Sequence, residues 1–190
     1  MTQLSTLKVF SNFQKYLQKI FPNILGYLVN GELVLIVPQD KIKNILVFLQ
    51  NHTHAQFKAL SDISGADYPD KKNRFEVTYN LLSITYNSRI SIVTYVDELT
   101  ATESITSIFP CANWLEREVW DMYGVFFYNN NDLRRILTDY GFKGHPLRKD
   151  FPLTGYVEVR YDELQKRVIT EKVSLAQDYR DFTFNSNWLN

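Results

Sequence analysis

Apolar and polar positions near the start of the chain follow first a helical pattern and then a strand pattern. A helix is predicted there because apolar side chains recur on one stripe, namely Phe10, Phe13, Leu17 and Ile20. Two apolar runs follow, Ile24 to Val29 and Glu32 to Val37, with Asn30-Gly31 between them. Asn-Gly tolerates the positive φ angles of a type I′ turn, so the pattern predicts a β-hairpin.

The next segments indicate another helix and then strands. Asp40 is positioned to cap a helix that ends near Asn51. The buried face of this helix is predicted from apolar residues at helical spacing, which are Ile42, Ile45, Leu46 and Leu49. Strands are expected over Phe57 to Ile63, from Phe75 towards Tyr86, and over Arg89 to Val96, because β-branched, aromatic and alternating residues dominate there.

A further helix is predicted to begin at Asn113. Asn113 is expected to be its N-cap, and Glu116, three residues later, is expected to complete a capping box. Gly124 is expected to end the helix in a left-handed conformation. The predicted inner stripe consists of Leu115, Val119 and Met122. Arg117 and Asp121 are four residues apart, which predicts an ion pair on the outer face.

A second, shorter helix is predicted over Asp132 to Leu137, and regular periodicity ends soon afterwards. Glycines and prolines interrupt the rest of the chain, where only Val157 to Tyr161 alternates like a strand. The stretch is nevertheless rich in aromatic residues, which disordered tails usually lack. The sequence therefore predicts an α+β domain over residues 1–137, with helices packed on a mainly antiparallel sheet. A long irregular C-terminal arm over residues 138–190 is expected to order on another protein.

Composition narrows the classes of partner. Of the 190 residues, 21 are lysine or arginine and 21 are aspartate or glutamate, so net charge does not favour nucleic acid or anionic lipid. Cys111 is the single cysteine, which excludes an intrachain disulfide and falls short of the four thiolates that usually hold an iron–sulfur cluster. No apolar run reaches the roughly 20 residues of a membrane-spanning helix. Any membrane association is expected to depend on a partner.

Candidate catalytic and ligand-binding groups are few. Glu118 and Asp121 have the spacing of a possible acid/base pair, but pairing with arginines is the simpler interpretation of these carboxylates. Cys111 lacks a neighbouring base. The three histidines, His52, His54 and His145, do not have the spacing of a zinc site. The chain has neither a Gly-x-Gly-x-x-Gly motif nor a Walker lysine, so it is not expected to bind a nucleotide or flavin.

Several unusual motifs lie in the second half of the chain. Glu-Arg-Glu-Val-Trp-Asp-Met-Tyr-Gly begins at Glu116, Asp-Leu-Arg-Arg-Ile-Leu at Asp132, and Gly-His-Pro-Leu-Arg-Lys-Asp-Phe-Pro at Gly144. With Asp-Ile-Ser-Gly-Ala-Asp-Tyr-Pro from Asp62, these motifs resemble the thirty-kilodalton subunit family of respiratory complex I, the NADH:ubiquinone oxidoreductase. The family usually has Asn-His-Pro-Asp where this chain has Asn129-Asn130-Asn131-Asp132, so any role of that histidine is absent here.

The resemblance implies a cofactor-free core subunit in the hydrophilic arm of the proton-pumping complex. Such a subunit is expected to support assembly and the geometry of the quinone-reducing module. The implied neighbours are the hydrogenase-related subunit at the quinone site and the subunit with the terminal iron–sulfur cluster, and flavin and clusters are expected in partner subunits. No nucleic acid and no direct membrane span are expected. The alternatives are a related subunit of a membrane-bound hydrogenase, a free-standing adaptor, and an enzyme that uses Glu118 and Asp121.

Residues with structural or partner-binding roles are expected in the same motifs, and no catalytic or metal-binding residue is expected. Four residues of the predicted helix are expected to hold the turn at Arg134 and Arg135. These four are Glu116, Arg117, Glu118 and Asp121. The segment from Gly144 to Tyr161 is expected to contact partners, since arginine and tyrosine are common interface anchors. Its candidate residues are Gly144, His145, Pro146, Arg148, Lys149, Asp150, Tyr156, Arg160 and Tyr161. Arg148→Ala is expected to hinder assembly more than folding.

The expected location combines this resemblance with composition. Scarce alanine and abundant asparagine, isoleucine and tyrosine are typical of an AT-rich genome such as that of an organelle. The matrix side of the mitochondrial inner membrane is therefore expected, with the cytoplasmic face of a bacterial plasma membrane as the alternative. The N-terminal segment lacks the arginines of a transit peptide and is expected to remain in the mature chain.

Overall fold

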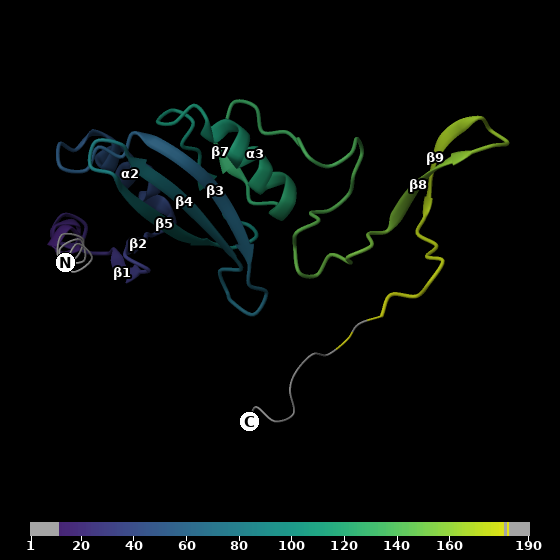
Figure 1. The fold of residues 1–190 in the computed structure, drawn as a ribbon, viewed down its shortest axis with the longest axis horizontal. Helices are drawn as coiled ribbons and strands as arrows, with labels where there is room; N and C mark the ends of the chain where they lie inside the picture. Colours follow the sequence, from purple (N-terminus) through teal and green to yellow (C-terminus); the bar gives the residue numbers. More distant parts are fainter. Residues whose placement is uncertain (1–11, 181, 183–190) are drawn as a thin grey trace, which may run out of the picture. The chain divides into compact units, whose positions relative to one another are not determined.

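The structure, a computed structural model, describes residues 12–180 and 182. The chain divides into two compact units, Met1–Asp150 and Phe151–Asn190, which are considered separately (Figure 1). Residues up to Asp150 group with the first unit, whereas the sequence placed the start of a C-terminal arm after Leu137. The contacts that attach residues 138–150 to the first unit are part of the candidate site described below.

A five-stranded sheet forms the frame of the first unit in its described part. Its strands are β1 (Leu25–Val29), β2 (Glu32–Ile36), β3 (Ala59–Asp67), β4 (Phe75–Ser83) and β5 (Ser88–Val96). Their order in space is β1-β2-β5-β4-β3. Neighbouring strands are antiparallel except β2 and β5, which pair in parallel. The predicted α+β class with a mainly antiparallel sheet is therefore confirmed.

The β1–β2 hairpin turns at the predicted residues. Asn30 has a φ of 50° and Gly31 a φ of 87°, which are the positive angles that a type I′ turn requires. The strands then pair in register from Val29 with Glu32 to Leu25 with Ile36. The local sequence therefore accounts for this hairpin.

Strand β4 shows how the sheet acquires one buried face. Its residues alternate between buried and half-buried along the whole strand, and Phe75, Val77 and Tyr79 lie on the buried side. Ile92 on β5 stands opposite Tyr79 in the register and is also buried. The apolar sides of the helices join these strand residues in one hydrophobic core, as expected for a helical layer on a half-buried sheet.

The first helix agrees with its predicted stripe only in part, whereas the second agrees in full. In the helix over residues 12–20, Leu17 is fully buried but Ile20 is 40% exposed, and Phe10 lies outside the described residues. Helix α2 (Ile42–Asn51) buries the four residues predicted for it. Asp40 does not cap this helix, because it lies in the preceding 3-10 turn η1 (Gln39–Lys41) and α2 has no side-chain cap at Lys41.

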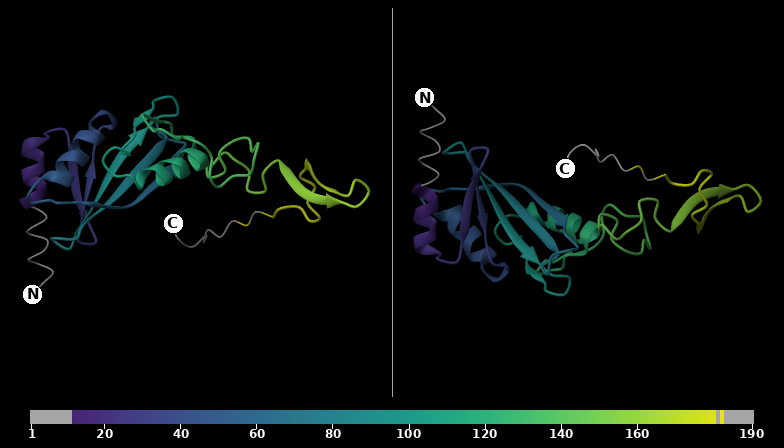
Figure 2. Two further views of the ribbon diagram at one scale, coloured as in Figure 1. Left: turned by 90° about the horizontal axis from the view of Figure 1, so that it is seen from above. Right: turned by 90° about the horizontal axis from the view of Figure 1, so that it is seen from below.

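Helix α3 (Ala112–Tyr123) lies along β3 (Figure 2). A glycine allows this close approach, because a Cβ atom at Gly65 would lie 2.7 Å from the ring of Tyr123. The short strands on either side of α3, β6 (Thr102–Glu103) and β7 (Phe127–Tyr128), pair in parallel with each other. This pairing brings together the segment that precedes α3 and the segment that follows it.

The described part of the second unit contains one β-hairpin. Strand β8 (Val157–Asp162) matches the predicted strand, and it pairs in antiparallel fashion with β9 (Arg167–Lys172), which the sequence analysis missed. Among the described residues of the chain, no helix is both long and apolar enough to cross a membrane.

Candidate functional site

Buried polar side chains of α3 form the centre of the candidate site. The predicted capping box is wrong, because α3 begins at Ala112 after Cys111, and no side chain caps it. Glu116 is instead fully buried, together with Asp121, while Arg117 is 3% exposed. Charged side chains are rarely buried this completely unless they are paired or hydrogen-bonded. Their partners therefore show what the helix holds.

Glu116 binds two loops, one before α3 and one after it. One carboxylate oxygen accepts the main-chain N–H of Ile105 at 2.7 Å, and the other accepts the hydroxyl of Ser104 at 2.7 Å. The side-chain amide of Asn130 donates to the second oxygen at 2.8 Å. Burial raises the pKa of Glu116, although these three hydrogen bonds oppose the rise.

Asn130, at the position where the family resemblance led us to expect a histidine, contacts both Glu116 and the loop that follows. Its Nδ2 donates to Glu116, and its Oδ1 accepts the main-chain N–H of Asp132 at 2.9 Å. A neutral amide therefore links the buried carboxylate to the loop after β7. The residue performs this task without a titratable group.

Asp121 holds the next part of the same loop. One of its oxygens accepts the main-chain N–H groups of Ile136, Leu137 and Thr138 at 3.2, 2.9 and 3.0 Å. The other oxygen accepts the Thr138 hydroxyl at 2.8 Å and the Arg135 guanidinium at 2.9 Å. Burial by itself raises the pKa of Asp121, but the donors outweigh this effect and lower it to about 2.

The predicted outer ion pair between Arg117 and Asp121 is wrong, since both residues are buried and bind the loop separately. Arg117 donates from Nε to the carbonyl oxygen of Arg134 at 3.1 Å and lies 3.9 Å from the carboxylate of Asp132. Its guanidinium also lies over the Trp114 ring. The predicted helix over residues 132–137 is wrong as well, because those residues form no helix and their amides bind Asp121 instead.

Residues 145–148 close the C-terminal end of α3. The final carbonyl groups of a helix lack partners within the helix. Here the carbonyl oxygen of Asp121 lies 3.0 Å from Nδ1 of His145, which must therefore carry the proton, and that of Met122 accepts the N–H of Leu147 at 3.1 Å. The carbonyl oxygen of Tyr123 accepts Nε of Arg148 at 2.6 Å. Burial lowers the pKa of His145, so a neutral imidazole is favoured.

Gly124 is required at this junction for two reasons. It ends α3 as predicted, with a φ of 81°. A Cβ atom at this position would also lie 2.5 Å from the guanidinium of Arg148 and 2.7 Å from the ring of His145. The chain therefore needs glycine both for the left-handed turn and for the packing of the segment that follows.

A third buried carboxylate fixes the end of this segment to the sheet. Asp67, at the end of β3, accepts the main-chain N–H of Lys149 at 2.7 Å. It also pairs with Arg74 through two hydrogen bonds of 2.6 and 2.8 Å, and Arg74 reaches Asp150 at 3.1 Å. The hydrogen bonds from Arg74 lower the pKa of Asp67. We call residues 130–150 the anchored segment, because Glu116, Asp121 and Asp67 all bind it.

Large apolar side chains nevertheless point outwards from the anchored segment. Tyr140 is fully exposed, Leu137 is 60% exposed and Leu147 is 51% exposed. Asp121 holds the main-chain amide of Leu137 and Met122 holds that of Leu147, while Tyr140 lies in the loop between these two points. Exposed apolar residues on a fixed backbone are typical of interaction surfaces. The sequence analysis placed Leu147 in the partner-contacting segment and Tyr140 in the C-terminal arm, but it named none of the three among its candidate residues.

The other predicted site residues are more dispersed. Glu118 is exposed and contributes nothing to the buried network. Gly144 adopts a φ of 96° at the start of the α3 closure, and Pro146 lies within that closure, half-buried. Tyr156, Arg160 and Tyr161 belong to the second unit, where Arg160 pairs with Glu171 at 2.7 Å. Of the predicted site residues, those of α3 and those between 134 and 150 therefore lie together in the first unit.

The groups at this site are poorly suited to catalysis. Asp121 accepts five hydrogen bonds within the described chain, which leave little capacity to take a proton from a substrate. Cys111 is exposed. No group of three or more metal-ligating side chains is found in the part of the chain that the structure describes. The buried polar atoms serve to hold loops.

Comparison with known proteins identifies the family. A family model described as the 30 kDa subunit of respiratory-chain NADH dehydrogenase matches residues 35–157, which include strands β3 to β5 of the sheet, α3 and the anchored segment. The chain belongs to this family. The resemblance seen in the motifs from Glu116 onwards is thereby confirmed.

Similar proteins extend this match along most of the chain. NADH-ubiquinone oxidoreductase subunit 9 of Reclinomonas americana is 56% identical over 172 residues, covering 90% of this chain and 84% of that protein. The subunit 9 protein of Prototheca wickerhamii is 54% identical over 180 residues, 94% of each chain. NADH dehydrogenase (ubiquinone) iron-sulfur protein 3 of Beta trigyna is 60% identical over 149 residues, 78% of each chain.

A solved structure shares the fold of this chain. It is a chain of the membrane-bound sulfane sulfur reductase, described as an archaeal respiratory membrane complex. The match has a TM-score of 0.65 and 27% identity, and covers 75% of this chain and 85% of that chain. The expected class of function, a subunit of a respiratory complex, is consistent with both kinds of comparison.

Proposed function

We propose that the chain is a core subunit of the hydrophilic arm of proton-pumping NADH:ubiquinone oxidoreductase. Its role is to support assembly and the geometry of the quinone-reducing module. The observation that carries this proposal is the anchored segment, in which buried carboxylates fix the loops while Leu137, Tyr140 and Leu147 face outwards. Family membership and the names of the relatives support the choice of complex.

A fixed loop suits a permanent interface on physical grounds. Ordering a loop at the moment of binding reduces affinity, because backbone and side-chain freedom are lost. In this chain the backbone at residues 136–138 and 147–149 is already bound to Asp121, α3 and Asp67. Exposed apolar side chains on that backbone can therefore bind a partner with a small entropic loss.

The proposed neighbours are the hydrogenase-related subunit at the quinone site and the subunit with the terminal iron–sulfur cluster. We place the C-terminal arm, residues 138–190, against these subunits, and the complex at the matrix side of the mitochondrial inner membrane. The relatives from Reclinomonas americana and Solanum tuberosum, both named as subunits of a ubiquinone-linked NADH dehydrogenase, support a respiratory setting.

We assign flavin and iron–sulfur clusters to partner subunits. Some relatives carry the name iron-sulfur protein 3, but this chain has a single cysteine, Cys111. A cluster is usually held by four thiolates, so the donors in this chain do not fit one. Electron transfer is therefore assigned to the neighbours whose positions this subunit maintains.

Two alternatives predict different behaviour. A subunit of a membrane-bound hydrogenase is disfavoured because relatives that are 54–60% identical carry the names of NADH-ubiquinone oxidoreductase or NADH dehydrogenase proteins. A free-standing adaptor would migrate as a small protein. Gentle solubilisation of source membranes, native separation and mass spectrometry would therefore test the proposal. Co-migration with NADH:quinone reductase activity supports it, and migration as a free chain overturns it.

A variant pair tests whether the anchored segment is the binding surface. Tyr140→Ala removes a fully exposed ring, so it should leave folding intact and lower the yield of assembled complex by about tenfold. Leu99→Ala is the matched control, since Leu99 is 95% exposed outside the anchored segment. Equal yields from the two variants would overturn the assignment of this surface.

A further inference from the structure

The outer edge of strand β9 presents unpaired main-chain groups. In the described residues β9 pairs with β8 alone. The N–H of Val173 donates to the carbonyl oxygen of Tyr156, which marks that pair as hydrogen-bonded. Antiparallel pairs alternate, so the register directs the main-chain groups of Arg167, Ile169 and Glu171 towards β8. Those of Val168, Thr170 and Lys172 point away from the hairpin.

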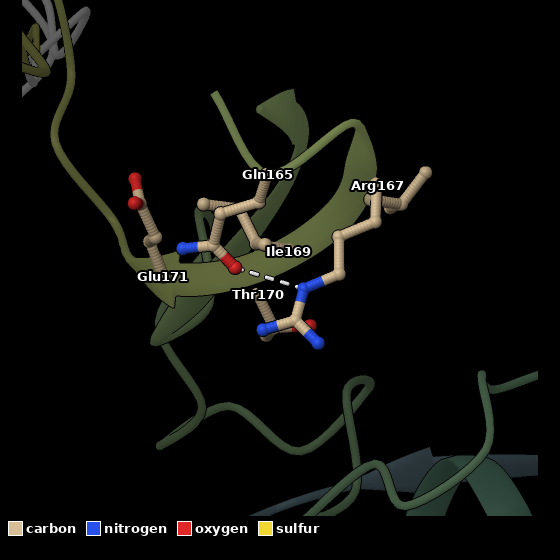
Figure 3. A pocket seen from close by; sticks show the side chains of 6 residues that line it. Gln165, Arg167, Ile169, Thr170 and Glu171 are labelled. Atoms are coloured by element: carbon tan, nitrogen blue, oxygen red, sulfur yellow. Dashed lines mark hydrogen bonds between the residues drawn. The ribbon is translucent and has the colours of Figure 1, made fainter. Parts of the chain in front are cut away.

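A surface hollow follows this same edge. It is lined by Gln165 and the consecutive residues Arg167 to Glu171 of β9 (Figure 3). Consecutive strand residues point to opposite faces of a sheet. A hollow lined by all of them therefore lies along the strand edge rather than over one face.

The edge of β9 carries the charged residues Arg167, Glu171 and Lys172 towards its ends, but it lacks two other features that protect edge strands. Exposed edges are commonly blocked by proline, a bulge or an inward-pointing charge. The β8–β9 ladder is regular from Val157 with Lys172 to Asp162 with Arg167, and β9 contains no proline. Its central residues are β-branched, which favours strand pairing. A two-stranded hairpin is only marginally stable alone, so an added strand would stabilise it.

Exposure and charge indicate the chemistry of the added strand. The side chains of Val159, Tyr161 and Val168 lie on one face and are 55–63% exposed, with Val159 at 57%. On the other face Glu171 already pairs with Arg160. Arg167 donates only to the side-chain oxygen of Gln165 at 2.8 Å, and no ion pair of Arg167 is found among the described residues. An acidic side chain beside Arg167 would complement it.

We propose that the free edge of β9 binds an extended segment of another subunit by main-chain hydrogen bonding. The segment carries apolar residues that continue the exposed face of Val159 and Val168, and an acidic residue next to Arg167. This inference rests on the proposed function, which supplies the partner subunits. Strand addition of this kind uses the backbone for affinity and alternating side chains for specificity.

Hydrogen exchange of the wild-type chain, compared between the isolated protein and the purified complex, is the direct test. The amides of Val168, Thr170 and Lys172 should exchange freely in the isolated chain and become protected on assembly. Rapid exchange of these amides within the complex would overturn the inference. Failure of the chain to enter any complex would instead overturn the proposed function, so the two failures are distinguishable.

A pair of proline variants provides a second test. Thr170→Pro removes an outward N–H of β9 without removing a donor to β8, and it should lower incorporation into the complex by about tenfold. Val159→Pro is the matched control, because it removes an outward N–H on the opposite edge, that of β8. Equal incorporation of the two variants would contradict the assignment to β9. Equal exchange rates of the Ile169 amide in the two isolated variants verify that both substitutions affect the hairpin alike.

Discussion

The main-chain N–H of Lys149 donates to the carboxylate of Asp67 across 2.7 Å, although 82 positions separate the two residues in the chain. This bond connects the end of the anchored segment to the end of β3. The same carboxylate holds Arg74, so one buried group joins the sheet, the β3–β4 loop and the anchored segment. Its loss should therefore affect all three.

Asp67→Asn tests this junction. The amide keeps the size of the side chain but removes the charge that pairs with Arg74, so we expect the free energy of unfolding to fall by roughly 3 kcal/mol. Asp70→Asn is the control, since Asp70 is exposed in the β3–β4 loop, three residues after Asp67. Urea unfolding of the full chain at neutral pH measures both. Equal stability of the two variants would contradict a structural role for Asp67.

Asp121 should make stability depend on acidity. The folded chain holds the pKa of this carboxyl at about 2, below its ordinary value of 3.8. The unfolded chain therefore binds the proton first as pH falls, and the stabilisation is present above about pH 4 and lost towards pH 2. Its size is about 2 kcal/mol. Urea unfolding between pH 2 and 7 should show this slope in the wild type and a weaker slope in Asp121→Asn.

Asn130→Asp should destabilise the chain by placing a second carboxylate 2.8 Å from buried Glu116. Two like charges at this distance cannot both remain ionised without a large loss of stability. We expect a decrease of about 3 kcal/mol at pH 7 and a partial recovery at pH 5, where one carboxyl takes up a proton. Asn131→Asp adds the same charge at an exposed neighbour and should change stability by less than about 0.5 kcal/mol. Equal urea midpoints of the two variants would refute this account.

Gly124→Ala and Gly141→Ala separate backbone strain from steric overlap. Both glycines have positive φ angles, 81° and 72°, but a Cβ atom at Gly141 would meet nothing within 4 Å. Gly141→Ala should therefore lose only about 1 kcal/mol from strain. Gly124→Ala should lose roughly 3 kcal/mol, because the methyl group also overlaps His145 and Arg148. Thermal unfolding of both proteins gives the difference, and similar losses would disprove the steric contribution.

Arg148→Ala should weaken folding as well as assembly. The sequence suggested a role mainly at the interface, but Arg148 donates to the last residue of α3 and lies over the Phe75 ring. Loss of this charged hydrogen bond should lower the free energy of unfolding by about 2 kcal/mol. Lys149→Ala is the control, because the group that binds Asp67 is the main-chain N–H, which the variant keeps. A wild-type unfolding midpoint for Arg148→Ala would return its role to the interface alone.

Local patterns were sufficient for the elements whose partners lie nearby in the sequence. Asn30-Gly31 determines its own turn angles, and the apolar stripe of α2 needs only a core to bury it. Glu116 shows why other predictions failed. Its spacing from Asn113 fits a capping box, but its carboxylate binds Ile105 and Ser104 instead. Tertiary hydrogen bonds of this kind leave no periodic signal.

The buried charges of α3 show the same limit in another form. Helical periodicity assigns polar residues to the solvent side, and by that rule Arg117 and Asp121 belong outside. They are buried because the loop over residues 132–138 covers them and supplies the donors and acceptors that they require. The sequence motif located the site, but the geometry depends on contacts between segments that no local pattern describes.

The parallel pairing of β2 with β5 has a consequence for the timing of folding. The β1–β2 hairpin is made early during synthesis, yet one edge of β2 must wait until α2, β3, β4 and β5 have left the ribosome. Long-range pairing of this kind is slow. Until Val96 emerges, the nascent hairpin exposes Leu33 and Leu35, which are fully buried in the finished fold. Chaperones that shield nascent apolar segments are therefore expected to act on the N-terminal third of this chain.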